Sequence, residues 1–152
     1  MNSAFDQSGS TITVSVGDAL PTVAHHPDER QLLLFCAATW NSHRIHYDRD
    51  RARAEGHRDL VVQGTLQGAW LADLVTSWAS SVGGTVRRFG FRNVGTAYVQ
   101  DELTATGRVT AAAEATDGGF EVQCALQMTG PDGVTAQGTA TIVLPARHSS
   151  PN

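Results

Sequence analysis

The second half of the chain alternates apolar and polar side chains with a period of two residues. The alternating runs cover residues 103–109, 120–128 and 134–144. This pattern predicts strands with one buried face, because successive side chains of a strand point to opposite sides of the sheet. Turn sequences at 117–119 (DGG) and 131–133 (PDG) separate the runs, as expected for antiparallel neighbours.

A single long helix is predicted ahead of these strands, over Gly64–Ser81. Its apolar residues recur at every fourth position from Leu66 to Trp78, and further apolar residues widen this face. Such a wide apolar surface predicts a helix that is largely surrounded by the rest of the fold. Residues 86–94 add a fourth strand, and we expect the four strands to form an antiparallel meander.

One apolar helix followed by antiparallel strands predicts an α+β fold in which the sheet curls around the helix. The edges of such a sheet remain open, so we expect pairing with a second subunit. The length of 152 residues fits one domain. We place this domain at residues 11–146, between a disordered N-terminus (1–10) and a C-terminal tail (147–152).

The first sixty residues carry weaker signals. Thr11–Val16 alternates and is a candidate strand, while Asp28 is a suitable N-cap for a helix over Glu29–Ala37. The stretch Trp40–Asp59 is polar, with little apolar periodicity, which predicts a long irregular loop. Such loops inside compact domains are more often functional than mere spacers.

Composition excludes several classes of protein. The net charge of −4 argues against a nucleic-acid binder, and the absence of a long apolar run argues against a transmembrane helix. All eleven Lys and Arg residues are arginines, which excludes lysine chemistry such as Schiff-base formation. The two cysteines, Cys36 and Cys124, are far apart and lie in apolar stretches. Both are therefore expected in the core of a cytoplasmic protein without disulfides.

The segment 38–64 contains the candidate catalytic and binding residues. It contains Ile45-His46-Tyr47-Asp48 and, some fifteen residues later, the run VVQGTL at 61–66. These two motifs resemble those of the MaoC-like hotdog family of (R)-specific enoyl-CoA hydratases and 3-hydroxyacyl thioester dehydratases. The resemblance extends over about residues 15–146.

The resemblance implies a single hotdog fold, in which an antiparallel sheet wraps around one long central helix. It also implies a lyase that hydrates a 2-enoyl-CoA to a 3-hydroxyacyl-CoA, or catalyses the reverse dehydration, in fatty acid or steroid metabolism. The substrate would be an acyl thioester of coenzyme A or of acyl carrier protein, and no cofactor or metal would be needed. The implied assembly is a homodimer or a heteromer with a second hotdog subunit.

The chain departs from the family motif at three positions. Asn41 stands where the family has its catalytic Asp, while His43 and Arg44 replace the motif's Asn and Pro. His46 is intact and suits a general base that deprotonates water. The amide of Asn41 can orient that water but cannot take a proton.

The missing carboxylate leaves several sources open. It can come from Asp48, from Asp50 or from a partner chain, or it can be absent altogether.

Gly64 opens the predicted helix, where free N–H groups and the positive end of the helix dipole are found. The resemblance implies that the backbone N–H of Gly64 polarises the thioester carbonyl, as it does in the family. A glycine lets the acyl group approach the backbone closely.

Two other functions remain open. The first is a non-catalytic hotdog partner that completes the acyl pocket of a catalytic chain, which the Asn41 departure favours. The second is a hotdog thioesterase, which would need a carboxylate on the central helix, where Asp73 is the only acid.

The remaining polar residues have simpler interpretations. The arginines at 44, 49, 51 and 53 are expected to form a solvated helix surface paired with Asp residues. Arg87, Arg88 and Arg92 are candidates for the phosphates of coenzyme A, since arginine binds phosphate in a bidentate manner. The pair His25-His26 has no further ligand nearby at metal-binding spacing.

Overall fold

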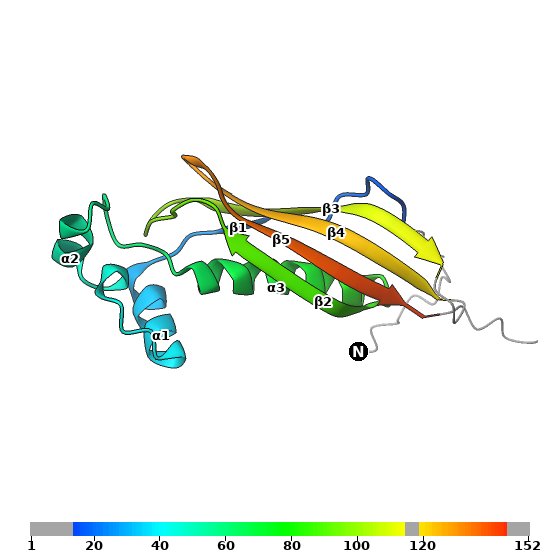
Figure 1. Ribbon diagram of the computed structural model, residues 1–152, viewed down its shortest axis with the longest axis horizontal. Helices are drawn as coiled ribbons and strands as arrows, with labels where there is room; N and C mark the ends of the chain where they lie inside the picture. Colours follow the sequence, from blue (N-terminus) through cyan, green and yellow to red (C-terminus); the bar gives the residue numbers. More distant parts are fainter. Residues whose placement is uncertain (1–13, 115–118, 146–152) are drawn as a thin grey trace, which may run out of the picture.

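The computed structural model describes residues 14–114 and 119–145 of the chain. Figure 1 shows one long helix lying along a twisted sheet, with shorter helices beyond one end. The helices are α1 (Glu29–Thr39), the 3₁₀ turn η1 (Arg44–His46), α2 (Arg49–Ala54) and α3 (Gly64–Ser81). The strands are β1 (Val23–His25), β2 (Thr85–Asn93), β3 (Leu103–Glu114), β4 (Phe120–Gly130) and β5 (Gly133–Leu144).

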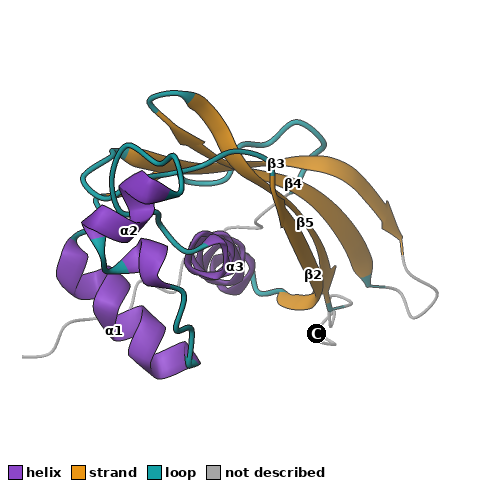
Figure 2. Cartoon of the chain, turned by 60° about the vertical axis from the view of Figure 1, so that its left-hand side comes forward, coloured by secondary structure: helices purple, strands orange, loops and turns teal. Residues whose placement is uncertain are grey.

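The five strands form one antiparallel sheet in the order β1-β3-β4-β5-β2. Figure 2, in which α3 is seen nearly end-on, shows the sheet over one side of this helix and α1 and α2 on another. A sheet curved over a single central helix is the α+β hotdog arrangement expected from the sequence. The bounds of α3 are also those expected.

The meander prediction is correct for β3, β4 and β5 and wrong for β2. Strand β2 does not lie beside β3 but pairs with β5 at the opposite edge, with Phe89 opposite Ala140. The reason lies in the segment after β2, which crosses the start of α3 before β3 begins. There Val62 N–H donates to the Ala97 carbonyl (2.9 Å), and Val99 N–H donates to the Leu60 carbonyl (2.9 Å).

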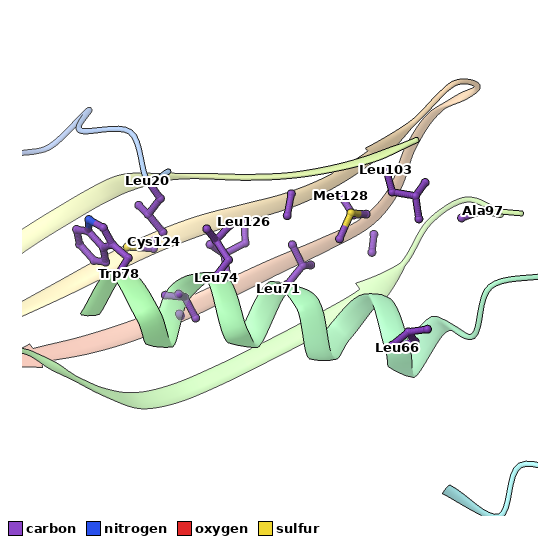
Figure 3. Packing of buried hydrophobic residues seen from close by; sticks show 14 of the residues in the cluster. Leu20, Leu66, Leu71, Leu74, Trp78, Ala97, Leu103, Cys124, Leu126 and Met128 are labelled. Atoms are coloured by element: carbon purple, nitrogen blue, oxygen red, sulfur yellow. The ribbon is translucent and has the colours of Figure 1, made fainter. Parts of the chain in front are cut away.

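The core lies between α3 and the apolar face of the sheet (Figure 3). Leu71 and Val75 of α3 are fully buried, and they belong to the same cluster as Met128 of β4. The alternation in β3, β4 and β5 was therefore interpreted correctly, apart from Phe120, which is exposed, and Thr135, which is buried. Both cysteines are buried and free, as expected.

The polar stretch Trp40–Asp59 is more ordered than predicted, because it contains η1 and α2. The N-cap of α2 is Asp48, whose side chain accepts from the Arg51 N–H (3.0 Å). The expected Asp-paired arginine surface is confirmed for Arg44–Asp48, Arg49–Asp59 and Arg53–Asp50. It is wrong for Arg51, which pairs with Glu55, and Arg49 also pairs with Glu29. These local charges stabilise short helices without the apolar periodicity on which the prediction relied.

The remaining predictions for the first half of the chain have mixed outcomes. Asp28 caps α1 by accepting from the Gln31 N–H (2.7 Å), and α1 continues two residues past the expected end at Ala37. Residues 14–16 do not form a strand. Residues 11–13, like the expected disordered N-terminus and C-terminal tail, lie outside the described part. Across the described ranges, no helix has both the length and the apolar character needed to cross a membrane.

Removal of core volume from α3 should destabilise the whole fold. Leu71 is 0% exposed, so Leu71→Ala should lower the free energy of unfolding by about 2–5 kcal/mol. Thr76→Ala, at an exposed position of the same helix, is the matched control and should change it by less than about 0.5 kcal/mol. Urea unfolding followed by circular dichroism measures both. Equal effects of the two substitutions would contradict the assignment of the α3 face.

Candidate active site

Three segments that are distant in sequence meet at the N-terminal end of α3. The segment just before α3 is bonded to η1 on one side, where the Val61 N–H donates to the Ile45 carbonyl (3.0 Å). On the other side Val62 is bonded to Ala97, on the segment that follows β2. Figure 3 shows Ala97 near the turn of α3 that carries Leu66. The backbone around the expected site residues is therefore held from both sides.

His46 lies in η1 and is only 7% exposed. Its Nδ1 is 2.7 Å from the carbonyl oxygen of Val61. A carbonyl can only accept, so Nδ1 carries the proton when the imidazole is neutral. The free lone pair is then on Nε2, which is the atom available to act as a base.

Burial lowers the pKa of His46 below its usual value of 6.5. The hydrogen bond to Val61 acts in the opposite direction, and the nearby His43 and His57 lower the pKa further. A lowered pKa keeps the imidazole neutral at pH 7, which is the state that a general base requires.

Gly64 is the first residue of α3, as expected. The N–H groups of Gly64 and Thr65 have no hydrogen-bond partner within residues 14–114 and 119–145. Gln63, the N-cap, makes no side-chain cap, and the first turn contains no acidic residue. The positive end of the longest helix is therefore free to bind an electronegative atom.

Gln63 has a role that the sequence analysis did not assign. Its side chain is only 1% exposed, and Nε2 donates to the Leu32 carbonyl (2.8 Å) and to the Cys36 sulfur (3.0 Å). These contacts attach α1 to the start of α3. Its Oε1 has no partner in the described part of the chain. The one sequence feature that could have indicated this role is the position of Gln63, a polar residue between the apolar pair Val61-Val62 and Gly64.

Asn41 follows α1 and is linked to His46 only indirectly. Its Oδ1 accepts from the backbone N–H of His43 (3.2 Å), and the His43 ring lies edge-on to the His46 ring, with 5.8 Å between centroids. Asn41 and His43 line a hollow of about 540 Å³, together with other residues from the end of α1, η1 and α2. Neither His46 nor Gly64 lines this hollow. Asn41 thus organises the loop that carries His46.

The two alternative carboxylates lie in α2 or at its start. Asp48 is engaged as the cap of α2 and in the ion pair with Arg44. The hydrogen bonds from Arg51 and Arg44 hold the pKa of Asp48 below its usual range. The side chain of Asp50 is 98% exposed. Within this chain, neither supplies a carboxylate poised beside His46.

The other candidates are scattered. Asp73 is exposed on α3, and His25 stacks on Trp70 with ring centroids 4.4 Å apart. The three arginines proposed for phosphate binding all lie on β2, where Arg87 contacts Glu121 (3.4 Å) and Arg92 contacts Gln137 (2.9 Å). Among the described residues, no cluster of three or more His, Cys, Asp or Glu side chains is arranged to hold a metal ion.

Comparison with known proteins gives consistent matches. Residues 2–99 match the sequence family described as hydroxyacyl-thioester dehydratase type 2. The chain is 31% identical over 134 residues to the 3-oxo-4,17-pregnadiene-20-carboxyl-CoA hydratase beta subunit of Mycobacterium tuberculosis, covering 88% of this chain and 98% of that subunit. It is 51% identical over 49 residues to mesaconyl-C(4)-CoA hydratase of Chloroflexus aurantiacus. The latter match spans 32% of this chain and only 18% of that protein.

Solved structures support the same fold. The ChsH1–ChsH2 complex from Mycobacterium tuberculosis matches with a TM-score of 0.75 at 25% identity, covering 88% of this chain and 100% of that chain. The (R)-hydratase from A. caviae matches with a TM-score of 0.77 at 19% identity, covering 88% of this chain and 98% of that chain. The fold expected from the sequence is thereby confirmed.

The contacts of Gln63 should contribute measurably to stability. Gln63→Leu keeps the approximate size of the side chain but removes the two hydrogen bonds that Nε2 donates, to the Leu32 carbonyl and to the Cys36 sulfur. The free energy of unfolding should fall by about 1–3 kcal/mol. Gln31→Leu, at an exposed position of α1, is the matched control. Chemical unfolding of both variants is the measurement. A Gln63→Leu variant as stable as the control would show that this attachment of α1 is dispensable.

Proposed function

This chain belongs to the hydroxyacyl-thioester dehydratase type 2 family, and from that premise we propose that His46 and Gly64 form its reaction centre. The chain is a hydratase/dehydratase of the hotdog fold, as expected from the sequence. The proposed reaction is the hydration of a 2-enoyl-CoA to a 3-hydroxyacyl-CoA, and its reverse. One observation supports this assignment most strongly. The buried His46 is held by a hydrogen bond from its Nδ1 to the Val61 carbonyl, and Val61 lies three residues before Gly64, whose N–H is free.

His46 is the proposed acid and base. Its Nε2 takes a proton from water as the water oxygen bonds to C3 of the enoyl thioester. The C2=C3 electron pair moves toward the thioester carbonyl, which becomes an enolate. The imidazolium then returns a proton to C2, so that one water molecule is added and His46 is regenerated.

Gly64 is the proposed site for the thioester carbonyl. Its free N–H lies at the start of α3, where the helix dipole favours negative charge. A donor placed there stabilises the enolate oxygen more than the uncharged carbonyl, and this difference lowers the barrier.

A second hotdog subunit is the proposed partner. The nine-residue strand β2 is one edge of the sheet and is largely exposed, whereas the other edge, β1, has three residues. We place the subunit contact at β2 because an unpaired edge of this length is a template for pairing. Two findings about relatives support this assembly, namely the beta-subunit name of one and the two-chain complex of another.

Replacing His46 should remove most of the activity. His46→Ala should lower kcat for crotonyl-CoA or a longer enoyl-CoA by at least about 10²-fold, the lower range for loss of a general base. The control is His26→Ala, at an exposed position. Loss of enoyl absorbance measures the rate.

The same assay separates the alternatives if it is run with and without a candidate second hotdog chain. A parent active only with that chain, and indifferent to His46→Ala, would identify a non-catalytic partner subunit. Release of free thiol without hydration would indicate the thioesterase. A parent active alone and indifferent to His46→Ala would contradict the site assignment.

The pH profile should report the lowered pKa of His46. A base works when neutral, so kcat/KM should rise with pH, with a midpoint below the ordinary histidine value of about 6.5. Asn41→Asp places a carboxylate in the loop of His43 and His46 and should move this midpoint to higher pH, because a negative charge favours the imidazolium. Rates measured from pH 5 to 9 test this. A midpoint that is the same in both proteins would show that position 41 is electrostatically remote from His46.

A further inference from the structure

The side chain of Asn93 lies directly against Gly64. If Gly64 carried a Cβ, that atom would be 2.7 Å from the Asn93 Cγ and 3.0 Å from its Oδ1, with Nδ2 closer than either. The amide of Asn93 therefore occupies the space beside the Gly64 Cα, the atom to which the Gly64 N–H is bonded. An L side chain at position 64 would displace it.

The fold fixes the backbone of Asn93 at this point. Asn93 is the last residue of β2 and pairs with Ala136 of β5. The next two N–H groups, of Val94 and Gly95, both donate to the Thr135 carbonyl (2.9 and 3.1 Å). The side chain is thus presented by a well-anchored backbone, although the residue itself is exposed.

The Asn93 amide is not used within the chain. Its side chain has no hydrogen bond to any residue of the described ranges, and it does not cap α3. A capping Asn would turn its oxygen toward the free N–H groups of the helix. Here Nδ2 is the Asn93 atom nearest to the position that a Cβ on Gly64 would take. An amide donor therefore lies beside the first residue of α3, whose own N–H has no partner within the described ranges.

We propose that Asn93 is a catalytic residue that supplies a second hydrogen bond to the thioester carbonyl oxygen, beside the N–H of Gly64. This inference rests on the proposed function. An oxygen bound to the Gly64 N–H lies within reach of the Asn93 amide, which donates through Nδ2. As water adds to C3, the C2=C3 electron pair forms a C1=C2 bond and the carbonyl π pair moves onto this oxygen, where both donors stabilise the enolate. When C2 receives its proton, the carbonyl reforms and no group leaves.

The test compares Asn93→Ala and Asn93→Asp with Gln127→Ala, which removes an amide on the outer face of β4. Loss of one donor to an oxyanion costs about 10²–10³ in kcat, so Asn93→Ala should lower kcat by about 10²-fold with little change in KM. Asn93→Asp should be worse, because its carboxylate repels the enolate. Its thermal stability should be equal or higher, since an acid near the start of a helix is favourable. Gln127→Ala should match the parent.

A spectroscopic measurement reports the same contact without turnover. The push–pull thioester 4-(dimethylamino)cinnamoyl-CoA absorbs at longer wavelength when its carbonyl is polarised. Bound to the His46→Ala protein, it should show a red shift that is reduced when Asn93→Ala is added.

The outcomes distinguish this inference from the function on which it rests. If the parent is active but Asn93→Ala keeps its kcat within about twofold and the red shift is unchanged, the role of Asn93 is overturned while His46 keeps its own. If Asn93→Asp is as active as the parent, Asn93 is not a donor. A parent inactive both alone and with a second hotdog chain would refute the proposed function. The red shift would then still decide whether Asn93 contacts a bound thioester.

Discussion

The hydrogen bond between His46 Nδ1 and the Val61 carbonyl connects the chemistry of this protein to its fold. Val61 belongs to the short extended segment that leads into α3 and is itself bonded to Ile45. Any shift of α3 along the sheet would move both the imidazole and the first N–H groups of the helix. The candidate base and the candidate carbonyl site are therefore placed by the same three residues of backbone, rather than by flexible side chains.

This arrangement makes the large core a requirement for the site. Leu71 and Val75 lock α3 against the sheet, and Gln63 attaches α1 to the start of the helix. The loop of Asn41 and His43 follows directly from the end of α1. A buried amide with two donated hydrogen bonds is rigid in this role, because losing either partner leaves a buried polar group unpaired.

Elements that depend on local hydrophobic periodicity could be predicted from the sequence. The position of a strand in the sheet, which depends on pairing between distant strands, could not. The bounds of α3 and most of the buried faces of β3–β5 follow from the hydrophobic period. The position of β2 does not, because an amphipathic strand fits either neighbour and only the crossing after Asn93 decides between them. His46 and Gly64 could be proposed from motifs. Asn93 could not, since its contact with Gly64 joins residues twenty-nine positions apart in sequence.

The Asn at position 41 changes how the site must work if the chain is active alone. An amide side chain cannot take up a proton near neutral pH, so His46 has to carry the proton in both directions. That task suits an imidazole kept neutral by burial and fixed in one tautomer. The proposed second hotdog subunit would offer another route, in which that chain supplies the carboxylate.

The tautomer of His46 tests the central claim most directly. Nitrogen-15 NMR of the imidazole rings, recorded over pH 5–8 and assigned with His46→Ala, reports which nitrogen carries the proton. The account predicts a protonated Nδ1 and an unprotonated Nε2 at pH 7, with a titration midpoint below about 6.5, the ordinary value for histidine. A proton on Nε2 at pH 7, or a midpoint above the ordinary value, would contradict it.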